Sequence, residues 1–401
     1  MARLTHEELN KVMEKYGVNE LFSWSKVDTA INSLYEYFLK YVLHIKEDRT
    51  DCAYAPLGGI SHSVIEDFYN GTIKHEDMIE SFNSGWITAI DIADLKFDRN
   101  DESKNRNISE KYKLNLEHFF MNHVPIKYKV ALEKFMTAKI GDYVFQGYID
   151  AIYKDDNGNY HIVDWKTSTK YSGKTAEEKC GQLVVYAIGL NQAGVPMDKI
   201  KICWNFLKYV SIQYEQANGA IKTREVERCK IGESLQANAK TWLKKLGYAD
   251  QMDEYLKLLL DTNNISCLPE DVQKKYVISD CYVYVPLTEK LIDKWKDVII
   301  LTIKDVKMRE TDYNETKSEM CFWDTDESVE KNSYYFATLC GYSGSVHKPY
   351  GKFLEKLESK KNGEDMFDGV GNKDIITETT DKVICNNKTD DNIDLSWLNN
   401  I

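Results

Sequence analysis

The stretch that decides the fold is residues 142–166, which read DYVFQGYIDAIYKDDNGNYHIVDWK. Apolar and aromatic side chains dominate 144–153 and 160–166, and this composition is typical of β-strands. The Asn157-Gly158 pair between them is a turn signal. The two segments are therefore predicted to pair as an antiparallel hairpin.

The length of the turn determines which side chains of this hairpin face each other. A two-residue turn puts Asp150 opposite residue 165, and Asp150 and Asp164 then lie on opposite faces of the sheet. A three-residue turn over 156–158 puts Asp150 opposite Asp164, and Gly158 supplies the positive φ that such a turn requires. We predict the odd-numbered turn, which brings the two carboxylates together.

Two facing carboxylates repel each other, and a hard divalent cation relieves the repulsion by binding their oxygen atoms. Lys166 follows Asp164 by two residues, on the same face of the strand, where an ammonium group can position or deprotonate a water. A neutral imidazole is a common metal ligand, and His62 can complete the site that Asp150 and Asp164 begin. The alternative is a structural charge pattern in which Lys166 neutralises the strand carboxylates.

The segments around the hairpin indicate the fold class. A helical pattern over 175–194 follows the hairpin, then a strand over 200–209 and a second hairpin across Asn218-Gly219. This order predicts an α/β layer. The predicted fold is a central mixed β-sheet flanked by helices, with helical elaborations at the N-terminal and C-terminal ends. The polar stretch 91–110 is predicted to be a loop between helices.

The predicted domain organisation is a single domain followed by a tail. Residues 1–358 form the domain, with a helical part at 1–139, an α/β core at 140–230 and a helical part at 231–358. Residues 359–401 are polar and acidic, and they are predicted to be disordered. The tail ends in DNIDLSWLNNI, an apolar cluster that suits a short linear motif for a protein partner.

The composition excludes several classes of protein. A hydrophobic fraction of 43% and a charged fraction of 29% are those of a globular chain, and no apolar run is long enough for a membrane helix. The nine cysteines are too widely spaced for a zinc ribbon and suit reduced, buried thiols, so the expected location is the cytoplasm. The net charge of −12 argues against a basic protein that coats nucleic acid. Candidates for a local basic strip on the later strands are Lys201, Lys208, Lys222, Arg224 and Arg228.

These motifs together resemble the RecB-like branch of the PD-(D/E)XK nucleases. The ordered signature of that branch is a histidine helix, a G-x-x-D strand, a D-x-K strand and a Q-x-x-x-Y helix. Its counterparts here are His62 in LGGISHSVIEDFY, Asp150 in GYIDAI, Asp164 and Lys166 in VDWKTS, and Gln182 with Tyr186 in QLVVYA. The match covers about residues 22–70 and 143–210.

The resemblance implies a restriction-endonuclease-like core and a role for each matched residue. His62, Asp150 and Asp164 bind Mg²⁺ or Mn²⁺, and the carbonyl of Trp165 is a further ligand. Asp150, Asp164 and Lys166 are the implied catalytic residues, with Lys166 acting on the attacking water. Gln182 and Tyr186 orient the site or the strand being cut.

One departure from the family concerns an iron–sulfur cluster that many relatives bind with four cysteines. The first cysteine position corresponds to Ser33 here, and Phe336, Ser343 and Val346 stand near Cys340 where other thiols are expected. No four-thiolate set can be assembled, so no iron–sulfur cluster is predicted.

The function implied by the resemblance is a metal-dependent DNA exonuclease in recombination, repair or phage DNA processing. One alternative is a structure- or sequence-specific endonuclease on the same fold. Another is a non-catalytic subunit that binds DNA ends. The expected partners are DNA and, through the tail, a replication or recombination protein, with no membrane partner.

Overall fold

The computed structural model describes residues 3–361, 397 and 398, and these fall into two compact units. Among the described residues, the first unit comprises 3–27 and 50–304. The second comprises the described residues 28–49, 305–361, 397 and 398. That residues 1–358 act as one nuclease domain stays a prediction. Among the described helices, none is long and apolar enough to cross a bilayer.

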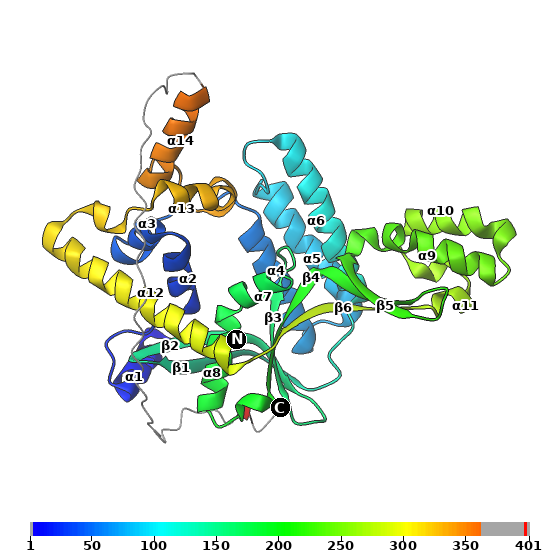
Figure 1. The fold of residues 1–401 in the computed structure, drawn as a ribbon, viewed down its shortest axis with the longest axis horizontal. Coiled ribbons are helices and arrows are strands. Elements are labelled where there is room, and N and C mark those ends of the chain that lie inside the picture. The colour runs from blue at the N-terminus through cyan, green and yellow to red at the C-terminus, as the bar shows by residue number, and fades with distance from the viewer. Residues whose placement is uncertain (1–2, 362–396, 399–401) are drawn as a thin grey trace. The chain divides into compact units, whose positions relative to one another are not determined.

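A six-stranded mixed sheet forms the centre of the first unit (Figure 1). Its strands are β1 (Val130–Ile140), β2 (Tyr143–Lys154), β3 (Tyr160–Lys166), β4 (Ile200–Glu215), β5 (Ile221–Glu227) and β6 (Tyr276–Val285). The order is β1-β2-β3-β4-β5, and β6 also pairs with β4. Only the β3–β4 pair is parallel. The mixed sheet flanked by helices confirms the predicted fold class.

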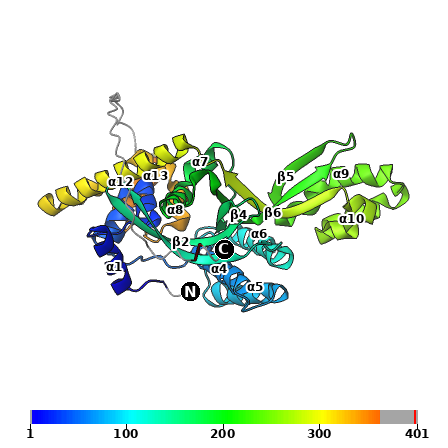
Figure 2. The same ribbon diagram turned by 90° about the horizontal axis from the view of Figure 1, so that it is seen from below.

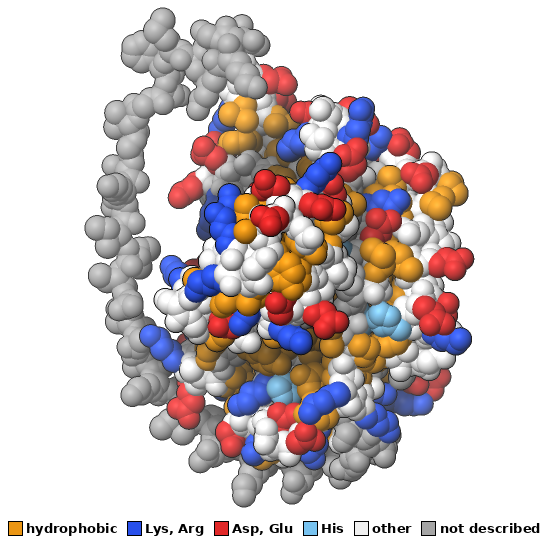
Figure 3. Space-filling model, turned by 90° about the vertical axis from the view of Figure 1, so that its right-hand side faces the viewer, with side chains coloured by type: hydrophobic (Ala, Val, Ile, Leu, Met, Phe, Trp, Pro, Cys, Tyr) orange, Lys and Arg blue, Asp and Glu red, His pale blue; other side chains and the backbone are white. Residues whose placement is uncertain are grey.

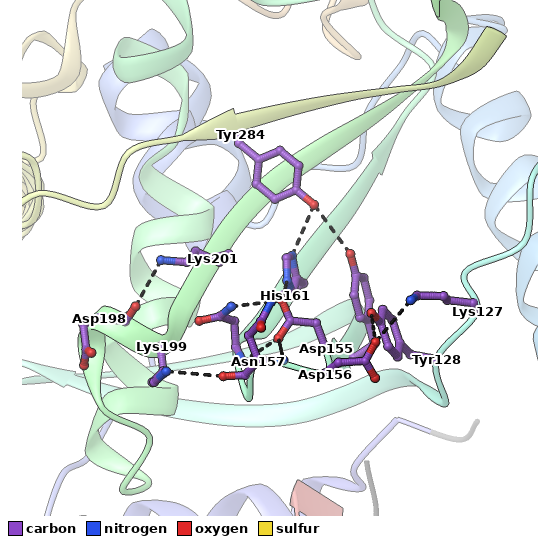
Figure 4. Close-up of polar contacts among 12 residues, drawn as sticks. Lys127, Tyr128, Asp155, Asp156, Asn157, His161, Asp198, Lys199, Lys201 and Tyr284 are labelled. Carbon is purple, nitrogen blue, oxygen red and sulfur yellow. Dashed lines mark hydrogen bonds and ion pairs between the residues drawn. The ribbon is translucent and has the colours of Figure 1, made fainter. Parts of the chain in front are cut away.

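The hairpin between β2 and β3 has the predicted odd-numbered turn. Asp155 N donates to Asn159 O at 2.9 Å, which leaves residues 156–158 as the turn, and Gly158 has a φ of 76°. The side chain of Asp155 accepts from Asn159 and contacts His161 at 3.1 Å (Figure 4). These local bonds fix the register of the two strands that flank the turn, β2 and β3.

Helices cover both faces of the sheet (Figure 2). On one face lie α4 (Tyr54–Tyr69), α5 (Met78–Trp86) and α6 (Glu102–Asn122), and on the other lie α7 (Lys174–Lys179) and α8 (Gly181–Gln192). The first group packs on the sheet through one apolar cluster that includes Leu57, Ile65, Phe82, Val163 and Trp165, all buried. Burial of these side chains is the main force that holds α4 on the end of β3.

Further helices pack on the far halves of β4 and β6 and project from the sheet in both views (Figures 1 and 2). They are α9 (Ile231–Lys245), α10 (Met252–Thr262) and α11 (Glu270–Gln273). At the N-terminus of the same unit, α1 (His6–Tyr16) begins with a capping box between Thr5 and Glu8.

The second unit has its own apolar core, formed by segments far apart in the sequence. It contains α3 (Leu34–Tyr37), α13 (Asp326–Lys331) and α14 (Lys348–Lys361), while α2 (Trp24–Asn32) and α12 (Glu289–Thr316) run through both units. Ser33 Oγ donates to Asp324 and lies 3.0 Å from His347 Nε2, and all three side chains are buried. Phe336 and Cys340 are also buried there. Apolar packing and this polar cluster therefore join the residue 33 region to the C-terminal helices of the unit.

Three expectations about secondary structure are wrong. β1 and β6 lie outside residues 140–230, in ranges predicted to be helical, because both strands pair with core strands over a long sequence separation. Helix α6 begins at Glu102, inside the predicted loop 91–110, because the Asp101 side chain caps it by accepting from Lys104 N at 2.9 Å.

The predicted tail also begins later than expected, because α14 continues to Lys361. Residues 362–396 and 399–401 lie outside the described residues. The prediction that the tail is disordered falls on these residues and stays a prediction. Trp397 and Leu398 form a short helical turn, and Leu398 is buried. The prediction that the tail binds a protein partner stays a prediction.

Candidate active site

The hairpin places the two predicted acids opposite each other. The register pairs Ala151 with Val163, so Asp150 lies opposite Asp164 at the next position. Asp164 is 2% exposed. Burial raises the pKa of Asp150 well above its usual value, and the nearby charge of Asp164 adds to the rise. Two carboxylates in this setting need a cation beside them.

Lys166 supplies one positive charge at this position. Its Nζ lies 2.7 Å from Asp164 Oδ2, and both side chains project from the same face of β3. Burial lowers the pKa of Lys166, but the charges of Asp164 and Asp150 outweigh this effect and raise that pKa above its usual value. Lys166 is therefore a cation at neutral pH. It compensates one of the two buried carboxylates.

The backbone of Trp165 links His62 to Asp150. His62 Nε2 lies 2.9 Å from the carbonyl oxygen of Trp165, and the amide nitrogen of Trp165 donates to Asp150 Oδ2 at 3.1 Å. His62 Nδ1 is 3.7 Å from the same carboxylate oxygen. The structure thus brings His62 from α4 and Asp150 from β2 to the backbone of one residue of β3, Trp165.

The donor set suits a hard divalent cation. Two carboxylates, a carbonyl oxygen and an imidazole are the ligands that Mg²⁺ and Mn²⁺ accept. Asp164 Oδ2 is buried without a hydrogen bond of good geometry, although the Lys166 ammonium lies beside it. Among the described residues, no three His, Cys, Asp or Glu side chains gather closely enough to hold a metal by themselves. His62 bonds to the Trp165 carbonyl through Nε2, and its other ring nitrogen, Nδ1, faces the Asp150 carboxylate, where it could bind a cation.

The predicted pair on α8 lies next to the two acids. Gln182 Nε2 donates to the hydroxyl of Tyr186 at 2.9 Å. Burial raises the pKa of Tyr186, and the charges of Asp164 and Asp150 raise it further. A Cβ at Gly147 would lie 2.8 Å from the ring of Tyr186. Glycine at this position of β2 therefore lets the ring lie against the strand.

A cavity of about 410 Å³ adjoins the site, and residues outside the predicted set also line it. Its lining includes His62, Glu66, Glu133, Tyr148 and Arg3. Glu133 lies opposite Asp150 in the β1–β2 pair and has a φ of 47°, which is unusual for a residue with a side chain. Burial and the charge of Glu133 raise the pKa of Glu66.

The spacing of Glu66, one turn after His62 on a helix, is a signal that the sequence does carry. Glu133 has no comparable signal, because its segment was predicted to be helical and it is not part of any motif. Its place opposite Asp150 depends on the long-range pairing of β1 with β2.

Two of the candidates for a basic strip, Arg228 and Lys208, have side chains that pack against other residues. Arg228 is 1% exposed and pairs with Asp280, so its assignment to a surface strip is wrong. Lys208 lies over the ring of Tyr112 at 4.7 Å, and burial lowers its pKa to about 8. Acidic and basic side chains are interspersed on the face shown in Figure 3.

The sequence of the chain matches one family of known proteins. The sequence model of the PD-(D/E)XK nuclease superfamily matches residues 21–321. The chain belongs to this superfamily. The match includes the histidine helix, both strands of the hairpin and helix α8, and it indicates metal-dependent nuclease activity with Mg²⁺ or Mn²⁺.

Other comparisons add little about this PD-(D/E)XK chain. No curated protein matches it. One similar solved structure, "Crystal structure of SSO0001", is 16% identical, and the match covers 48% of this chain and 75% of that one. The TM-score is 0.16, which supports no argument about shape or function.

Proposed function

We propose that this PD-(D/E)XK protein is a metal-dependent DNA exonuclease of the RecB-like branch. Its role is DNA recombination, repair or phage DNA processing, and its location is the cytoplasm. The observation that carries the proposal is the convergence of His62, Asp150 and Asp164 around the backbone of Trp165, with Lys166 beside Asp164. That set of groups suits hydrolysis of a phosphodiester.

The chain's own residues have distinct tasks in this proposal. A bound Mg²⁺ or Mn²⁺ supplies a positive charge that lowers the pKa of water and stabilises charge on the phosphate. Asp150, Asp164, His62 and the carbonyl of Trp165 are the groups that would hold it. Each is fixed by β2, β3 or α4, so little reordering of the backbone is required.

Lys166 acts on the nucleophile. Its ammonium group can orient the attacking water with a hydrogen bond and stabilise negative charge as the oxygen–phosphorus bond forms. The hydroxyl of Tyr186 and the amide of Gln182 lie near the same carboxylates and can donate hydrogen bonds to a phosphate oxygen. As the new oxygen–phosphorus bond forms, the bond to the 3′ oxygen breaks; the attacking water loses a proton to solvent, and the departing 3′ oxygen takes one up.

The proposal is tested with linear and closed circular DNA, each incubated with Mn²⁺ or with EDTA. Asp164→Ala serves as the matched inactive variant. We expect release of nucleotides from linear DNA only, with a requirement for Mn²⁺ and for Asp164. Nicking of the circle would show an endonuclease instead. Binding to DNA ends without cleavage would show a non-catalytic subunit.

A further inference from the structure

We propose that Tyr69 is a positioning residue for the active site. It fixes the backbone of Trp165, to which both His62 and Asp150 are bonded. The inference rests on the proposed function, since a positioning role has meaning only if those groups act together. Tyr69 is the last residue of the segment LGGISHSVIEDFY that contains His62, but the family signature assigns no role to this position.

The first contact is a stack between two rings. Tyr69 and His62 both belong to α4, two helical turns apart. The ring of Tyr69 stacks on the indole of Trp165, with centroids 6.2 Å apart and planes at 13°. The ring of His62 meets the same indole edge-on at 5.9 Å and 86°. The indole of Trp165 therefore contacts two residues of one helix, and these contacts help to fix the backbone of Trp165 as well.

The hydroxyl of Tyr69 has a fixed direction. The backbone N–H of Ile126 donates to this oxygen at 3.0 Å, so the phenol proton is free for His123 Nε2 at 3.1 Å. His123 Nε2 is then an acceptor, and its Nδ1–H donates to Asp280 Oδ2 at 2.7 Å. Each donor in this series of hydrogen bonds, from Ile126 to Asp280, has one acceptor. The two hydrogen bonds therefore fix the position of the hydroxyl end of the Tyr69 ring.

The far end of the network is rigid. Asp280 on β6 pairs with Arg228, and Arg228 Nε donates to the carbonyl of Leu207 on β4 at 2.7 Å. His123, Asp280 and Arg228 are all buried. Burial opposes ionisation of Asp280, but the hydrogen bond from His123 and the charge of Arg228 outweigh it and lower the pKa of this carboxyl. A buried polar network with satisfied partners rigidifies its surroundings.

The network therefore reaches from β6 through the end of α6 to the last turn of α4. A metal ligand set loses affinity when the groups behind it are removed, even if the ligands remain. Tyr69→Phe removes the hydroxyl and keeps the ring, so His62 and Trp165 stay in place but are held less firmly. We expect the dissociation constant for Mn²⁺ to rise about tenfold, the lower end of the effect of losing an outer partner.

The test measures Mn²⁺ binding by calorimetry, without DNA, for the wild type, Tyr69→Phe and Tyr276→Phe. Tyr276 is the matched control, because its buried hydroxyl donates to Asn238 at 2.7 Å in the part of the sheet under α9. Tyr69→Phe loses two hydrogen bonds and Tyr276→Phe loses one, so both variants should have a lower Tm, by about 2–4 °C for each kcal/mol of stability lost. Cleavage of linear DNA at varied Mn²⁺ is the second readout.

Weaker Mn²⁺ binding in Tyr69→Phe alone, with cleavage restored at high Mn²⁺, supports the positioning role. Equal Mn²⁺ binding in the two variants would overturn it and leave the proposed function intact. A wild type that binds no Mn²⁺ and cleaves no DNA would overturn the proposed function and this inference with it.

Discussion

The carbonyl oxygen of Trp165 lies 2.9 Å from Nε2 of His62, although the two residues are 103 positions apart in the chain. This contact joins the helix that carries the histidine to the strand that carries Asp164 and Lys166. It explains how motifs that are weak one at a time form a single site. The indole of Trp165 is buried in the core on the other side of its strand, so packing and chemistry depend on the same residue.

Lys166 is expected to contribute more to the rate of cleavage than to the affinity for the metal ion. Lys166→Met removes the ammonium that lies 2.7 Å from Asp164, so this carboxylate loses a competitor for a cation. Mn²⁺ affinity should stay the same or increase, while the rate of single-turnover cleavage falls by about a hundredfold or more. Calorimetry and rapid-quench kinetics measure the two quantities. A loss of Mn²⁺ affinity equal to that in Asp164→Ala would contradict this separation of roles.

Gly147 is expected to be necessary for the position of Tyr186. In Gly147→Ala the added methyl group would lie 2.8 Å from a ring carbon of Tyr186, which is buried and has little room to move. The strain should lower the free energy of unfolding by about 1–3 kcal/mol, and cleavage should slow even where the protein remains folded. Urea denaturation and cleavage rates test this. The double variant with Tyr186→Leu should recover stability but not activity.

Gly158 is expected to contribute to stability through its backbone alone. At a φ of 76°, an alanine is strained by about 1–2 kcal/mol, and asparagine is tolerated better. The free energy of unfolding should therefore fall in the order Gly158, Gly158→Asn, Gly158→Ala. Cleavage per folded molecule should persist, because the register of the hairpin does not change. Gly219, at a φ of 82° in the second hairpin, is a control site at which the same order is expected.

His118 is expected to make stability depend on pH below neutrality. Burial, with the charge of Arg228, lowers the pKa of His118 to about 4 from its ordinary 6.5. Between those values the unfolded chain binds the proton and the folded chain does not, so stability is lost as the pH falls from about 6.5 to 4. The loss from this residue is on the order of 3 kcal/mol.

Urea denaturation at pH 7, 6, 5 and 4.5 measures how the free energy of unfolding changes with pH. The same measurement on His118→Gln is the comparison. Glutamine can still accept from Arg228 but does not titrate, so the variant should lose less stability over this range. If the free energy of unfolding changes equally with pH in the wild type and in His118→Gln, His118 is not the source of the pH dependence.

Much of the site was predictable from sequence because its signals are local. The turn residues Asp155 and Gly158 fix the hairpin, and alternation along a strand then sets the direction of Asp150, Asp164 and Lys166. Helical spacing likewise predicts that Gln182 and Tyr186 lie on one face, where a hydrogen bond joins them.

The missed features depend on pairing between distant segments. Glu133 lies opposite Asp150 only because β1 pairs with β2, and β1 has no strong strand pattern of its own. Tyr69 reaches Asp280 through His123, three residues that no spacing rule connects. Arg228 had the sequence features of a surface cation, but its ion pair with Asp280 buries it.

The most direct test of the central claim is a crystal structure of the protein with Mn²⁺, with anomalous data that locate the ion. We expect a peak about 2.0–2.3 Å from carboxylate oxygens of Asp150 and Asp164 and from the carbonyl of Trp165, with His62 completing the set. A peak elsewhere, or none at saturating Mn²⁺, would contradict the shared cation on which the proposed cleavage depends.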